Sequence, residues 1–235
     1  MNNVTEENAN INEVADGKTD NNEPKKIRLS SIIIILAIAA AGVYFIYTNF
    51  FGAKPEITVN GKKVTMRSTI QELYDDGFVL CSDSGSVLSP SGSVGGKQIY
   101  NISYHLGVPR GDGGYADLTG IIITPANFDS GSKDIKECSI YEIVYYPAYD
   151  SAAADVLIGG EKLDTDDLAT WADFFAEKKY PFEESEINNF RNGNNTMLLG
   201  KTGRYKFEAR AKGYGEEAFS YIRFTRNIEV KYETR

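Results

Sequence analysis

The longest apolar stretch of the chain lies near its N-terminus. From Ile32 to Phe51 the sequence reads IIIILAIAAAGVYFIYTNFF, twenty residues without a charged side chain. At about 1.5 Å per residue, a helix of this length spans the roughly 30 Å hydrocarbon core of a bilayer. The pattern predicts a single transmembrane helix over residues 29–52.

Basic residues on either side of this run predict its orientation. Lys25, Lys26 and Arg28 precede it, whereas only Lys54 follows immediately. Loops that carry more Lys and Arg stay in the cytoplasm, so we expect a cytoplasmic N-terminus and an extracytoplasmic C-terminal region in the cell membrane. Residues 1–28 are rich in Asn, Glu and Asp and predict a disordered cytoplasmic tail.

Small residues inside the run leave a second interpretation open. The segments 37–39 and 39–41 resemble the sites at which secretory signal peptides are cleaved. The long polar stretch before the run, and the apolar residues after those sites, favour an uncleaved signal-anchor over a cleaved peptide. The lipid bilayer is the partner that this reading implies.

After the run, the spacing of apolar residues changes first to that of strands and then to that of a helix. Asn60-Gly61 separates two short alternating segments, and this dipeptide suits the positive φ angles of a type I′ hairpin turn. Thr69 then offers an N-cap with Glu72 three residues on, and Gly77 provides a stop. We expect a β-hairpin followed by a short helix from about Thr69 to Asp76.

The middle of the chain is predicted to be mostly β. A Ser- and Gly-rich stretch, residues 82–96, lacks a periodic apolar pattern and predicts a mobile loop. Strands are expected over residues 78–81, 98–106, 120–124 and 139–146. Together with the hairpin and helix they form a predicted β-rich α+β subdomain over residues 53–150.

A second subdomain, residues 151–235, is predicted to combine a helix with an antiparallel sheet. Residues 156–163 repeat the order of the first hairpin, and acidic residues then precede Leu168, Trp171, Phe174 and Phe175 at helical spacing. Strands are expected over residues 205–211, 219–226 and 228–232. The predicted fold class is α+β: one N-terminal transmembrane helix, then an antiparallel-sheet-rich extracytoplasmic region with two or three short helices.

Net charge and the scarcity of candidate catalytic residues argue against several classes of function. The formal charge is −8, and no Lys/Arg stripe occurs beyond the cluster before the apolar run, which argues against nucleic acid as a partner. The motif Ser130-Gly131-Ser132-Lys133 meets the serine-x-x-lysine pattern but falls in a predicted loop. No catalytic, cofactor-binding or metal-binding residue is predicted, and His105 is the only histidine.

Cysteine and tyrosine supply the candidate site residues. Cys81 and Cys138 are either a disulfide, which would stabilise the fold by roughly 4 kcal/mol, or two buried thiols. Tyrosine joins a flat apolar ring to a hydrogen-bonding tip, which suits sugar or peptide binding. Sheet packing explains the same residues equally simply. The tyrosines of this candidate aromatic binding face are Tyr100, Tyr104, Tyr141 and Tyr145.

The chain resembles a group of uncharacterised membrane-anchored or lipoprotein surface proteins of Gram-positive bacteria. The resemblance rests on the segment VNGKKVTMRSTIQELYDDGFVL and on the later Cys138-containing strand, which is followed by a helix and a terminal sheet. The resemblance covers most of residues 56–232 and implies a noncatalytic surface module. It transfers no functional residue. The order of helix and sheet in the final part is also similar to small modules of the β-lactamase-inhibitor-like type, at the level of the fold alone.

The sequence therefore predicts a single-pass membrane protein that presents a noncatalytic binding or structural module to another cell-envelope protein or glycan. Two alternatives stay open. One is a membrane-tethered regulator that signals through its N-terminal tail. The other is an unrecognised cell-envelope hydrolase that uses scattered carboxylates.

Overall fold

The computed structural model describes residues 29–50, 55–111, 113–150, 154–163, 166–215 and 218–232. The tail predicted over residues 1–28 lies outside this range. The chain divides into two compact units between Gly42 and Val43.

The first described element is the helix α1, Leu29–Phe50. The side chains of its residues 33–43 are all exposed. Over the described residues, no helix combines the length and the apolarity that a membrane crossing needs. The predicted transmembrane helix thus rests on the sequence of residues 32–51.

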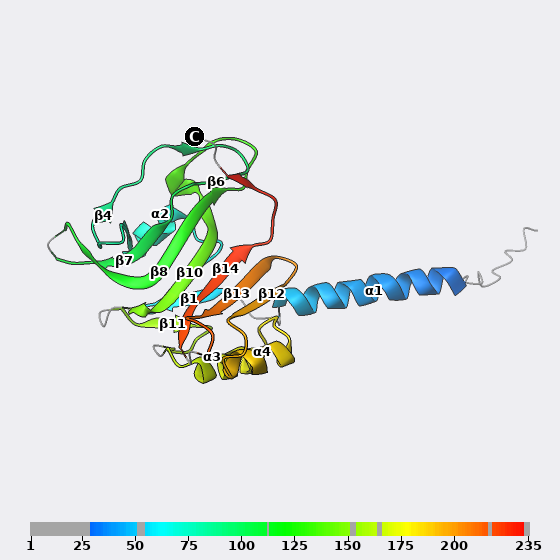
Figure 1. The fold of residues 1–235 in the computed structure, drawn as a ribbon. Coiled ribbons are helices and arrows are strands. Elements are labelled where there is room, and N and C mark those ends of the chain that lie inside the picture. The colour runs from blue at the N-terminus through cyan, green and yellow to red at the C-terminus, as the bar shows by residue number, and fades with distance from the viewer. Residues whose placement is uncertain are drawn as a thin grey trace, which may run out of the picture. The chain divides into compact units, whose positions relative to one another are not determined.

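The second unit is built on antiparallel sheets, which confirms the predicted α+β class (Figure 1). Its ten-stranded sheet has the order β12-β13-β14-β10-β8-β7-β3-β4, and β6 pairs with both β8 and β15. A three-stranded sheet has the order β11-β1-β2, and β5 pairs with β9. The strands are β1 Glu56–Val59, β2 Lys62–Thr65, β3 Val79–Cys81, β4 Val87–Leu88, β5 Ser93–Val94, β6 Gln98–Ile99, β7 Tyr104–Pro109, β8 Ala116–Asn127, β9 Lys133–Asp134, β10 Ser139–Asp150, β11 Val156–Ile158, β12 Met197–Lys201, β13 Tyr205–Ala211, β14 Phe219–Arg226 and β15 Lys231–Tyr232.

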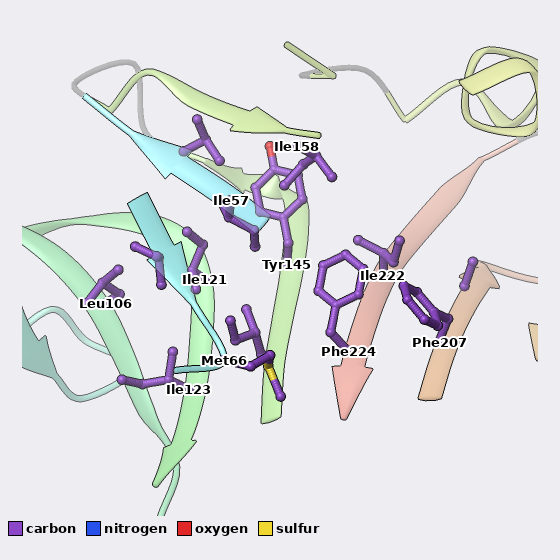
Figure 2. Close-up of a cluster of buried hydrophobic side chains, with 14 of the residues drawn as sticks. Ile57, Met66, Leu106, Ile121, Ile123, Tyr145, Ile158, Phe207, Ile222 and Phe224 are labelled. Atoms are coloured by element: carbon purple, nitrogen blue, oxygen red, sulfur yellow. The ribbon is translucent and has the colours of Figure 1, made fainter. Parts of the chain in front are cut away.

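Helices and the small sheet cover one face of the large sheet. The helices are α2 Ile70–Asp75, a 3-10 turn Ile135–Glu137, α3 Leu168–Glu177 and α4 Glu184–Arg191. Figure 2 shows Ile57 and Ile158 of the small sheet beside Tyr145 of β10, with side chains of β8 and β14 in the same layer. Apolar side chains fill this face of the sheet. Because successive side chains of a strand point to opposite faces, the residues between these apolar ones point to the other face.

Local signals in the sequence place several of these elements. Asn60 and Gly61 have φ angles of 50° and 78°, as a type I′ turn requires, and they join β1 to β2. Thr69 and Glu72 form a reciprocal capping box at the start of α2. Asp167 caps α3 by accepting from the amide of Thr170. The predicted hairpin, short helix and aromatic helix are confirmed.

Other expectations are corrected by pairing between distant segments. Residues 82–96, expected as a mobile loop, contain β4 and β5, which are held by β3 and β9. The strand expected over residues 98–106 is interrupted, because β6 pairs with β15 and β8 while β7 pairs with β3 and continues to Pro109. The last strand is only Lys231–Tyr232 and runs parallel to β6.

The division predicted between residues 150 and 151 is not a boundary in the structure. Strand β11 pairs with β1, and β14 pairs with β10, so both predicted subdomains contribute to the same sheets. Residues 43–235 form one compact unit. The reason is physical: both halves contribute side chains to one continuous apolar core, so neither half buries its sheet face alone.

Candidate functional site

The uncovered face of β12, β13, β14 and β10 carries the candidate site. Phe207 of β13 and Phe224 of β14 are buried in the core. Residues next to them along each strand, Lys206, Glu208 and Arg223, therefore project from the opposite face. Strand β12 adds Leu199, whose side chain is 57% exposed and lies opposite Glu208.

This face is hollowed beside β12. The hollow has a volume of about 450 Å³. Its lining combines cations, carboxylates and one large exposed apolar side chain, and consists of Glu142, Leu199, Gly200, Lys201, Lys206, Phe207, Glu208, Arg223 and Thr225. An apolar wall beside several polar groups is the usual composition of a ligand site.

Two lysines lie directly opposite each other at one end of the hollow. Lys201 of β12 pairs in register with Lys206 of β13, and both are exposed. Within the described part of the chain, neither forms an ion pair. Like charges directly opposite each other on a sheet destabilise it. The pair leaves two positive charges that a bound anion would neutralise.

The carboxylates of the hollow are already engaged by Arg223. Its Nη1 lies 3.2 Å from Glu208 Oε2, and its Nε lies 3.5 Å from Glu142 Oε2. The Tyr221 hydroxyl donates to Glu208 Oε1 at 2.6 Å, and Thr225 Oγ1 donates to Glu142 Oε2 at 3.4 Å. Arg210 Nε also lies 3.8 Å from Glu208 Oε1, so the two carboxylates are paired with two arginines rather than with the lysines.

Burial shapes the protonation of this network. It raises the pKa of Glu142, even though the attraction of Arg223 and the hydrogen bond from Thr225 oppose the change. Burial, followed by the hydrogen bond to Glu208, raises the pKa of Tyr221 to about 12. Tyr221 thus remains a neutral donor at physiological pH. Arg223 also lies over the Tyr221 ring, with its Cζ 5.2 Å from the ring centroid, which holds the guanidinium in place.

The arrangement suits binding of an anionic group next to an apolar one. Lys201 and Lys206 supply the positive charge, and Leu199 supplies the apolar contact. Among the described residues, no group of three or more His, Cys, Asp or Glu side chains is placed to hold a metal ion.

The structure has no disulfide between Cys81 and Cys138, because both thiols are free and buried. Cys138 belongs to the main apolar core, and its Sγ donates to the Asp134 carbonyl at 3.5 Å. Leu80 points into that core, so the adjacent Cys81 points to the other face, where it packs beside Gly107. Of the two interpretations left open by the sequence, the structure has the two buried thiols.

The four tyrosines of the candidate aromatic face do not share a surface. Tyr145 is 1% exposed and contacts Trp171, and Tyr104 is 4% exposed with Tyr100 stacked on it at 6.2 Å. Tyr141 falls at an irregularity in the register between β10 and β8, where the extra residue changes the side-chain alternation. The sheet-packing interpretation accounts for Tyr104 and Tyr145.

The structure places the single histidine opposite a cysteine, since His105 of β7 pairs with Cys81 of β3. Burial raises the pKa of the Cys81 thiol and lowers that of His105. Both side chains are thereby held neutral, which is the reverse of the thiolate–imidazolium pair that a cysteine nucleophile needs. The serine-x-x-lysine segment ends at Lys133, whose Nζ pairs with Asp129 at 2.5 Å.

The pattern of residues 178–204 predicts neither β12, which carries part of the site, nor α4. The apolar run Met197-Leu198-Leu199 before the turn residues Thr202-Gly203 is the local signal for a hairpin with β13.

Comparison with known proteins identifies no relative: no protein-family model matches this chain, and neither a curated protein nor a solved structure is similar to it. The resemblance to Gram-positive surface proteins therefore stays a prediction.

Proposed function

We propose that this chain is a single-pass membrane protein that presents a noncatalytic binding module outside the cytoplasm. The uncharged run from Ile32 to Phe51 supports the anchor, and the basic residues before it support a cytoplasmic N-terminus. The module is the unit that follows the anchor, and its ligand is an anionic group on another envelope component.

One observation carries the binding part of this proposal. Lys201 and Lys206 lie opposite each other on adjacent strands, neither forms an ion pair with a described residue, and both line the same hollow as Leu199. A chain with a formal charge of −8 has many carboxylates, yet the hollow's own Glu142 and Glu208 are turned to Arg223. The lysines are left for an external anion.

Binding is tested with the full chain in detergent micelles and inorganic polyphosphate as the anionic probe, with neutral dextran as its control. We expect the double variant Lys201→Glu/Lys206→Glu to weaken polyphosphate binding at least about tenfold. The matched control is Lys136→Glu/Lys179→Glu, which reverses two exposed lysines outside the hollow. Equal binding by the double variant and the wild type would exclude the hollow as the anion site.

Placement is tested by thiol labelling. Because Cys81 and Cys138 are each 1% exposed, the native thiols are poor reporters. Tyr214 is 79% exposed, so Tyr214→Cys places a reactive thiol on the surface of the module. We expect a membrane-impermeant reagent to label this variant, and not the wild type, on intact cells. Labelling only after the membrane is broken would reverse the proposed orientation.

A further inference from the structure

Strand β12 forms one end of the large sheet and is hydrogen-bonded to a described strand on one side only, that of β13 (Figure 1). An edge strand offers a row of backbone N–H and C=O groups to which another extended chain can pair. The hollow described above lies beside this edge, since Leu199 and Lys201 of β12 help to line it.

The hydrogen bonds at the two ends of β12 show which backbone groups face outward. The Ala211 amide donates to the Thr196 carbonyl at 3.0 Å, and the Thr202 amide donates to the Tyr205 carbonyl at 2.8 Å. In an antiparallel ladder the residues that bond to the partner strand alternate. Even-numbered residues of β12 therefore bond to β13, and the backbone groups of Met197, Leu199 and Lys201 point away from it.

Of these outward groups, the Met197 amide is satisfied, because it donates to Asn195 Oδ1 at 3.1 Å. No described residue hydrogen-bonds to the outward amides of Leu199 and Lys201. The other face of β12 is closed, since a Cβ on Gly200 would lie 2.1 Å from the Pro181 carbonyl oxygen. Access is thus confined to the edge and to the face that carries the lysines.

A lysine on an edge strand often serves only to prevent pairing. One lysine is sufficient for that purpose, and Lys206 lies on β13, inside the sheet. Placing a second lysine opposite the first adds repulsion that edge protection does not require. Carboxylates on an incoming strand would remove this repulsion, and the exposed side chain of Leu199 would gain an apolar contact.

We infer that β12 accepts an extended acidic segment of a partner protein as an added antiparallel strand of the sheet. The segment carries an acidic residue opposite Lys201 and an apolar residue opposite Leu199. Residues directly opposite each other share a face of the sheet, so these two ligand residues are separated by one position. This inference rests on the proposed function for its binding surface, and it names the class of partner.

The direct test uses the full chain in detergent micelles and the labelled peptide Thr-Glu-Thr-Val-Thr-Glu-Thr, whose Glu and Val residues share one face of a strand. The control peptide replaces each Glu by Lys. We expect the acidic peptide to bind at least about tenfold more tightly than the basic one, measured by fluorescence anisotropy at about 0.15 M salt. Equal affinities would overturn the charge complementarity on which the inference depends.

Backbone pairing is tested by methylating the peptide. Residues opposite Leu199 and Lys201 direct their amides toward β12, so N-methylation of Glu and Val should weaken binding at least about tenfold. N-methylation of the Thr residues, whose amides point away, should change it by less than about twofold. Equal effects of the two methylation patterns would overturn strand addition, without requiring any protein variant to fold.

A protein variant separates this inference from the proposed function. Leu199→Pro removes a backbone amide that points away from β13 and takes no part in the hydrogen bonds between β12 and β13. It retains both lysines. Because Leu199 also lines the hollow, polyphosphate binding will fall too, but we expect the acidic peptide to lose at least about tenfold more affinity than polyphosphate does. If peptide binding survives in Leu199→Pro, strand addition is wrong while the anion site stands. If Lys201→Glu/Lys206→Glu changes neither ligand's affinity, both proposals fail.

Discussion

The indole of Trp171 lies flat against the ring of Phe219, with centroids 4.0 Å apart and an interplanar angle of 9°. This contact joins α3 to β14, and both side chains are fully buried. It fixes the helix on the covered face of the sheet and leaves the opposite face of the same strand, with Arg223, for the candidate site.

We expect Trp171→Ala to lower the free energy of unfolding by about 3–5 kcal/mol, because a large cavity replaces the indole beneath the sheet. Urea unfolding followed by circular dichroism measures the change. Tyr214→Ala is the control: its side chain is 79% exposed, so we expect a change within about 0.5 kcal/mol. Equal losses in the two variants would contradict the position of α3.

Tyr180 is a buried phenol whose hydroxyl has no hydrogen-bond partner among the residues that the structure describes. Leaving such a group unpaired costs about 1–3 kcal/mol, so Tyr180→Phe should be neutral or raise the free energy of unfolding by about 1 kcal/mol. The matched variant Tyr221→Phe removes the 2.6 Å hydrogen bond to Glu208 and should lower it. A clear loss of stability in Tyr180→Phe would show that its hydroxyl is satisfied in solution.

Cys138 predicts an alkaline loss of stability, because burial raises the pKa of its thiol from 9.0 to about 11. A pKa that is higher in the folded state contributes stability that is complete below pH 9 and is lost as the pH rises through 11. We expect wild type to lose roughly 2 kcal/mol more than Cys138→Ala over this interval. Urea unfolding at several pH values gives both slopes, and tyrosine ionisation contributes to each protein. Parallel slopes would contradict the prediction.

The capping box of α2 predicts a local stability effect. Thr69 Oγ1 accepts from the Glu72 amide at 3.1 Å, and Glu72 Oε2 accepts from the Thr69 amide at 2.8 Å. We expect Thr69→Ala to cost about 1 kcal/mol and Thr69→Ser, which retains the hydroxyl, to cost much less. Thermal and urea unfolding would show the difference. Equal costs would mean that the methyl group, not the cap, stabilises this position.

Pairing between distant strands explains why the sequence could not supply the candidate site. The alternation in residues 139–146 correctly turns Ile143 and Tyr145 inward, but the irregularity at Tyr141 arises from pairing with β8. In the same way, the hairpin signal at Thr202-Gly203 does not give the register in which Lys201 faces Lys206, or the position of β12 at the edge of the sheet. A shift of one residue in that register would turn either side chain to the other face.

The sequence by itself determined those features that depend on a few neighbouring residues: the Asn60-Gly61 turn, the Thr69 cap and the amphipathic helix around Trp171. Backbone sterics and short-range hydrogen bonds are sufficient for these. Only the tertiary structure decided that Cys81 and Cys138 point to different sides of the sheet and that β12 is left at its edge. Those outcomes depend on which distant strands pack their apolar faces together. That pairing is fixed cooperatively by the packing of the whole core and not by any local segment.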